Sequence, residues 1–92
     1  MVIGQDVITV QRVSRYCLQG GAEVFPYYGA PTVEEVTLFD PEISVLCLPL
    51  PKSFLCNLNQ RYILWSEQPV LINLPLVSTK RELENYLQLA LH

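Results

Sequence analysis

The sequence predicts an α+β domain in which a mostly antiparallel sheet of about five strands carries a C-terminal helix on one face. Three observations support this fold class. Residues 7–18 are rich in Val, Ile and Thr, residues 43–48 and 70–77 are apolar stretches of strand length, and residues 79–91 have the spacing of an amphipathic helix. The 92 residues are expected to form a single compact domain, 1–92.

Residues 7–18 are predicted to form a strand near the start of the chain. Their β-branched side chains suit a pleated sheet better than a helix. A helix with Val7, Val10 and Cys17 on one face is the weaker interpretation.

A glycine pair follows this segment and favours a tight hairpin turn. Gly20 and Gly21 readily adopt the positive φ angles that such turns need. Residues 22–28 are therefore expected to return as a second strand. Pro26 lacks a backbone N–H, which places this strand at an edge of the sheet.

Residues 32–39 fit both a strand and a helix. Thr32 and Glu35 have the spacing of a capping box, and apolar residues recur at every third position. Residues 36–39, however, have the composition of a strand. The strand is the favoured interpretation.

Apolar strands are expected in the second half of the chain. Residues 43–48 are apolar on both faces apart from Ser44, which predicts a position in the middle of the sheet. Residues 53–60 are interpreted as a turn or two of helix, residues 62–65 as a short strand, and residues 70–77 as another strand.

The C-terminal helix, residues 79–91, has the clearest pattern. Thr79 is expected to cap it while the side chain of Glu82 reaches back. Leu89 lies off the apolar stripe and is a candidate contact for another chain. The stripe itself consists of Leu83, Tyr86, Leu87, Ala90 and Leu91.

Charge is scarce and unevenly distributed. Charged residues make up 16% of the chain, against about 25% in a typical soluble domain. Residues 16–51 contain no Lys or Arg but five of the nine acidic residues. The six basic residues are scattered, so no nucleic-acid partner is expected. The acidic half is interpreted as a solvated face, with docking of a basic protein as the functional alternative.

Few residues offer chemistry for catalysis or metal binding. The single histidine is His92, and Cys17, Cys47 and Cys56 lack the spacing of metal ligands, so reduced, buried thiols are expected. The adjacent carboxylates Glu34 and Glu35 make a poor acid–base pair, because neighbouring strand residues face opposite ways. No glycine-rich phosphate loop is present. We therefore expect no catalytic residue, no metal and no cofactor.

The chain is expected to be cytoplasmic and not inserted in a membrane. Its longest run without a charged residue, 68–79, is too short to span a bilayer. The first residues lack the basic and apolar regions of a signal peptide.

Aromatic and acidic side chains are the candidate partner contacts. Tyr27 and Tyr28 are consecutive in a predicted edge strand, so one of them faces away from the core. Trp65 is a further candidate because tryptophan is enriched in interface hot spots, although a half-buried core position is the commoner explanation. Glu34 and Glu35 belong to the acidic docking alternative.

The sequence favours a non-enzymatic protein–protein interaction module that acts as a regulatory, assembly or accessory subunit. A small-ligand-binding or catalytic domain is the alternative. A symmetric homodimer is also expected, because two strands that are apolar on both faces need cover that one helix does not provide. A helix or apolar loop over residues 50–60 is the competing explanation for that cover.

Overall fold

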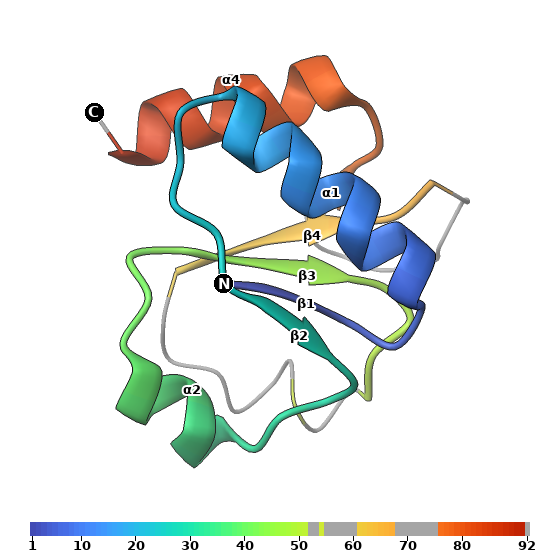
Figure 1. The fold of residues 1–92 in the computed structure, drawn as a ribbon, viewed down its shortest axis with the longest axis vertical. Coiled ribbons are helices and arrows are strands. Elements are labelled where there is room, and N and C mark those ends of the chain that lie inside the picture. The colour runs from blue at the N-terminus through green and yellow to red at the C-terminus, as the bar shows by residue number, and fades with distance from the viewer. Residues whose placement is uncertain (52–53, 55–60, 68–75, 92) are drawn as a thin grey trace.

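Helices and strands alternate through the first half of the chain in the computed structural model (Figure 1). The structure describes residues 1–51, 54, 61–67 and 76–91. The elements in chain order are β1 (Val2–Gly4), α1 (Val7–Gln19), β2 (Pro26–Tyr28), α2 (Val33–Phe39), β3 (Ser44–Cys47), β4 (Tyr62–Trp65), β5 (Leu76–Val77) and α4 (Lys80–Leu91).

The five strands form one sheet in the order β2-β1-β3-β4-β5, and every neighbouring pair is parallel. The predicted mostly antiparallel α+β sheet is therefore wrong, and the domain is α/β. Parallel neighbours need a crossover connection rather than a hairpin. Two segments that were predicted as strands, α1 and α2, are the crossovers from β1 to β2 and from β2 to β3.

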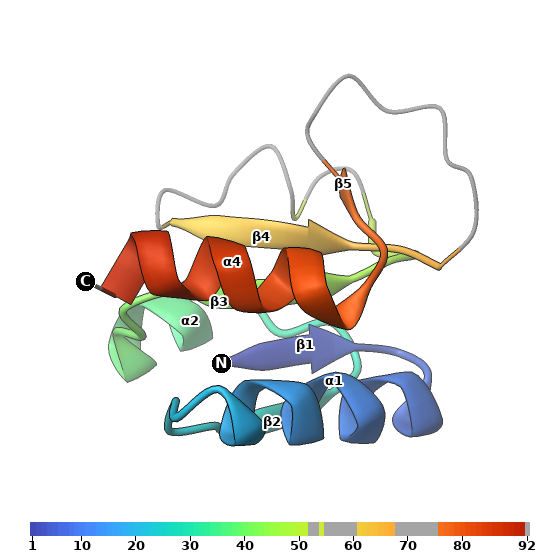
Figure 2. The same cartoon turned by 90° about the horizontal axis from the view of Figure 1, so that it is seen from above.

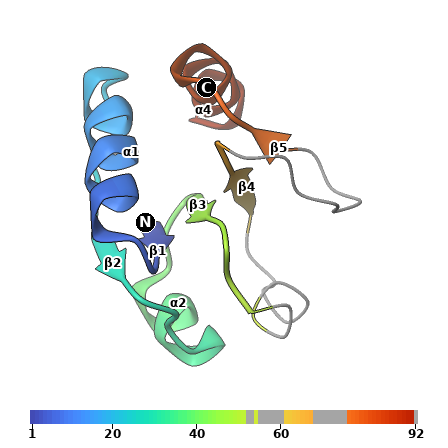
Figure 3. The ribbon, with the colours of Figure 1, turned by 90° about the vertical axis from the view of Figure 1, so that its right-hand side faces the viewer.

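The sheet is covered on both faces. Figure 3 shows α1 and α4 on one side and α2 on the other, and α1 packs against α4 (Figure 2). On the α2 side, Ile3, Val36, Leu46, Phe54 and Leu64 form a buried cluster. The expectation of a single covering helix is thus wrong. The argument that an uncovered face requires a homodimer loses its basis.

Helix α1 replaces the strand predicted over residues 7–18. The Asp6 carboxylate caps it by accepting the Ile8 N–H at 3.2 Å and the Thr9 hydroxyl at 2.7 Å. The buried residues of α1 are Val10, Val13, Ser14 and Cys17, a set with helical spacing. The predicted strand is wrong because burial of one helical face outweighs the strand preference of the β-branched residues in this segment.

The glycine pair ends α1 instead of making a hairpin. Gly21 has a φ of +88°, and its N–H donates to the Leu18 carbonyl at 3.0 Å. The Ala22 N–H donates to the Cys17 carbonyl at 3.1 Å. These two bonds make a Schellman cap, in which glycine takes the left-handed position. The glycine pair therefore terminates a helix, and the hairpin predicted at this position is wrong.

Helix α2 replaces the strand favoured over residues 32–39. Thr32 caps this helix as its sequence indicates, because the Glu35 N–H donates to Thr32 Oγ1 at 3.1 Å. Asp40 then ends the helix in a left-handed conformation, with φ of 53°. Here the local capping signal predicted the structure better than strand propensity did.

Several predicted elements are confirmed. Residues 62–65 form β4, and β3 lies in the middle of the sheet with all four residues buried. Strand β2, with Pro26, lies at an edge. Helix α4 begins beside Thr79, whose Oγ1 accepts the Glu82 N–H at 3.2 Å.

Parts of two predictions fall outside the described residues. Leu76 and Val77 form β5, whereas the rest of the strand predicted over residues 70–77 is not described. The predicted helical turn over residues 53–60 is described at Phe54 alone, which is buried. Among the described helices, none combines the length and apolar character needed to cross a membrane.

Candidate functional site

A cleft of about 640 Å³ opens at the amino ends of β1 and β3, on the side where Figure 1 marks the N-terminus. Its volume lies within the range of about 300 to 1,000 Å³ that is typical of binding pockets. The end of α1, the α1–β2 connection and the α2–β3 connection form its walls. The lining includes Cys17, Val24, Phe25, Phe39, Ile43 and Leu87.

Two phenylalanine rings form one wall of the cleft. The ring centroids of Phe25 and Phe39 are 4.5 Å apart, and each residue is 46% exposed. The Phe25 carbonyl accepts the Val2 N–H at 2.9 Å, which fixes the chain beside β1. Phe39 is the last residue of α2. Phe25 is therefore positioned by a backbone hydrogen bond to β1 and Phe39 by the end of α2, while about half of each residue stays exposed.

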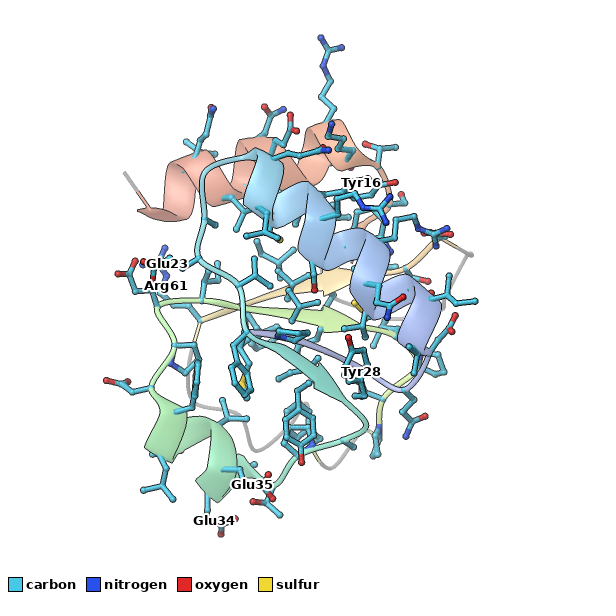
Figure 4. The ribbon with its side chains drawn as sticks, in the orientation of Figure 1. Tyr16, Glu23, Tyr28, Glu34, Glu35 and Arg61 are labelled. Atoms are coloured by element: carbon cyan, nitrogen blue, oxygen red, sulfur yellow. The ribbon has the colours of Figure 1, made fainter. Side chains whose placement is uncertain are left out.

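The rim of the cleft carries acidic side chains. Glu23 and Glu42 are lining residues and both are exposed. Among the described residues, the positive groups on this side of the molecule are the amino group of Met1 and the side chain of Arg61, which Figure 4 draws on the same side as Glu23. The Met1 amino group donates to the Ile43 carbonyl at 3.1 Å, and burial lowers its pKa.

Cys17 lies in the inner wall of the cleft, but its thiol is a poor nucleophile. Burial raises the pKa of Cys17 to about 11 and that of Cys47 to about 12. Both thiols therefore stay protonated near neutral pH, and the thiolate is the reactive form.

Native Cys17 and Cys47 are expected to resist alkylation by iodoacetamide at mildly alkaline pH, because both are buried and protonated. Peptide mapping by mass spectrometry should find them modified only after urea is added. The same pKa shifts predict how stability depends on pH. Above about pH 9 the two thiols ionise in the unfolded state but not in the folded state, so the free energy of unfolding falls as pH rises toward 11 to 12. Rapid labelling of native Cys17 would contradict this picture of the inner wall.

The tyrosine pair of β2 is divided between two environments. The Tyr27 hydroxyl donates to Glu35 Oε2 at 2.9 Å, and this hydrogen bond raises the pKa of Tyr27. Its ring packs against the cluster on the α2 face. Tyr28 is 48% exposed and is drawn below α1 in Figure 4. Tyr27 is therefore a link between β2 and α2, and Tyr28 is the more accessible of the two.

The other candidate contacts lie away from the cleft. Trp65 is 2% exposed and packs against Tyr16, with ring centroids 6.0 Å apart, so it belongs to the core rather than to a contact surface. Leu89 is 83% exposed on α4, and Glu34 is exposed on α2. Neither lines the cleft. Phe25 and Phe39 were not predicted, because their pairing depends on two crossovers.

At the carboxyl end of β1, the described residues pack closely against β3 and α1. In doubly wound sheets, ligands bind at the carboxyl ends of the strands where the strand order reverses, here between β1 and β3. A Cβ on Gly4 would lie 2.8 Å from Cys47 Cβ and 2.8 Å from Val10 Cγ2. Asp6, just beyond β1, uses its carboxylate to cap α1. The cleft at the amino ends is therefore the better candidate site.

No three His, Cys, Asp or Glu side chains among the described residues gather into a group suited to a metal ion. Comparison of the chain with protein-family models, curated proteins and solved structures gave no match.

Proposed function

We propose that this domain is a non-enzymatic protein-interaction module that receives an apolar side chain of a partner protein in the cleft. The observation that carries this proposal is the half-exposed pair Phe25 and Phe39 in the wall of a cleft whose lining is more apolar than polar. Aromatic residues dominate interface energetics because they bury a large area with few rotatable bonds. A partner side chain that covers the pair would remove this surface from water.

The lining favours a protein segment over a small polar ligand or substrate. Glu23 and Glu42 are the charged side chains among the described lining residues, and the remaining walls are largely apolar. Pockets for small ligands usually combine apolar walls with several convergent polar groups that fix the orientation of the ligand. The protonated Cys17 thiol supports a binding role over a catalytic one.

The proposal includes a cytoplasmic location. Cys17 and Cys47 are free and buried thiols, which suit a reducing compartment. A homodimer remains a separate prediction, and sedimentation velocity measures it directly: a mass near 10.5 kDa at tens of micromolar would contradict it. Contact between two copies, cleft to cleft, is disfavoured because it would bring their glutamates together.

The proposed function is tested by selecting random peptides displayed on phage against the immobilised domain. Enriched peptides are then synthesised with a fluorescent label, and their binding is measured by anisotropy. Phe39→Ala is expected to weaken binding roughly tenfold or more, because it removes half of the aromatic wall. Leu89→Ala removes an apolar side chain of α4 that is more exposed than Phe39, 83% against 46%, and is expected to leave binding unchanged.

Circular dichroism checks that both variants remain folded, and Phe25→Ala provides a second test of the same wall. If Leu89→Ala weakens binding and Phe39→Ala does not, docking occurs on α4 and the assignment to the cleft is wrong. If no peptide is enriched by the domain, the proposed binding function is wrong.

A further inference from the structure

We infer that the partner segment that enters the cleft is basic, with lysine or arginine side chains next to its apolar anchor. This inference rests on the proposed function and adds the chemistry of the partner. It follows from the charges around the cleft rather than from the aromatic wall.

Acidic residues surround the cleft on several elements. Glu23 lies in the α1–β2 connection, Glu42 lies in the α2–β3 connection, and Asp40 ends α2. Glu34 and Glu35 lie on α2 away from the cleft (Figure 4) and are not part of its rim. The stretch from residue 16 to residue 51, which supplies all these carboxylates, contains no Lys or Arg.

The positive groups near the cleft do not cancel this charge. The Met1 amino group is engaged with the Ile43 carbonyl, and its lowered pKa reduces its charged fraction near neutral pH. Arg61 is the other described basic side chain on this side of the molecule, against the three carboxylates of Glu23, Asp40 and Glu42. A neutral or acidic segment would meet this excess negative charge without compensation, whereas a basic segment would balance it.

The two parts of the site are expected to act on different steps of binding. Exposed rim charges mainly raise the rate of association and make it sensitive to salt. Desolvation of the phenylalanine wall mainly slows dissociation. The partner segment is therefore recognised by two separable features, one apolar and one positively charged.

The experiment uses two labelled synthetic peptides, one built from leucine and lysine and the other with every lysine replaced by glutamine. Both are titrated against the wild-type domain, the double variant Glu23→Gln with Glu42→Gln, and Phe39→Ala. Glu84→Gln is a control, because it removes one carboxylate, paired with Lys80 on α4, that does not line the cleft. Rates are measured by stopped flow at low and high salt, and thermal unfolding checks that every variant is folded.

The lysine peptide is expected to bind more tightly than the glutamine peptide and to lose affinity in Phe39→Ala. The double variant should weaken its binding roughly three- to tenfold, mostly through slower association, and should reduce the salt dependence. Glu84→Gln should behave like the wild type.

Two other results would distinguish a failure of the basic-partner inference from a failure of the proposed function. If both peptides bind equally well, depend on Phe39 and ignore the double variant, the partner is not selected for basic charge, and the inference is wrong while the interaction function stands. If neither peptide depends on Phe39, the cleft is not the binding site, and the proposed function fails together with the inference.

Discussion

Replacing Trp65 with alanine is expected to lower the free energy of unfolding by about 3 to 5 kcal/mol. The side chain is 2% exposed and lies in the buried cluster between the sheet and helices α1 and α4. A loss of this size approaches the total stability of a small domain, about 5 to 15 kcal/mol. Equilibrium urea unfolding measures it, and a change below about 1 kcal/mol would show that the indole does not fill the core.

Two controls refine this prediction. Trp65→Phe should cost much less than Trp65→Ala, because a phenyl ring keeps most of the buried volume and the buried indole N–H makes no hydrogen bond to the described residues. Tyr86 lies on the exposed side of α4 and is 43% exposed. Tyr86→Ala is therefore expected to change the free energy of unfolding by no more than about 1 kcal/mol.

Gly4→Ala is expected to destabilise the domain by about 1 to 3 kcal/mol through overpacking. The added methyl would lie 2.8 Å from Cys47 Cβ and 2.8 Å from Val10 Cγ2, closer than carbon atoms approach in folded proteins. Cys47 Cβ is fixed by the backbone of β3, so a change of side-chain rotamer does not relieve this contact. Urea unfolding monitored by tryptophan fluorescence gives the change in free energy.

Gly20→Ala is the matched control for this substitution. The closest atom to a Cβ at Gly20 would be the Cys17 carbonyl oxygen at 3.5 Å, an ordinary contact, and φ at Gly20 is −81°. Its effect is expected to stay within about 0.5 kcal/mol. If Gly4→Ala and Gly20→Ala lowered the free energy of unfolding equally, the close approach of β1 to β3 would not contribute to the cost of Gly4→Ala.

Local sequence patterns predicted an element correctly where they fitted only one type of secondary structure. The apolar stripe and capping residues identified α4, and the run apolar on both faces identified β3 as a central strand. Helix α1 was missed because Val7, Ile8 and Val10 favour strands by composition, while the Asp6 cap and the buried spacing favour a helix. Here tertiary burial outweighed intrinsic propensity.

Local sequence patterns do not predict the order of the parallel strands or the presence of the cleft. β1 lies between β2 and β3, an arrangement that depends on contacts between distant segments. Phe25 and Phe39 meet because α2 brings the chain back past the amino end of β2. The acidic character of residues 16–51 was visible in the sequence, but its position around an apolar cavity was not.

The uneven placement of charge gives the molecule a permanent electric dipole moment. Around the cleft and α2, acidic residues are in excess, whereas the described charges on the side of α1 and α4 balance. These are Arg12, Arg15, Lys80 and Arg81 against Asp6, Glu67, Glu82 and Glu84. On a positively charged support such as an anion-exchange resin, the domain should therefore adsorb in a preferred orientation, with the cleft facing the support and the α1 and α4 layer facing the solvent.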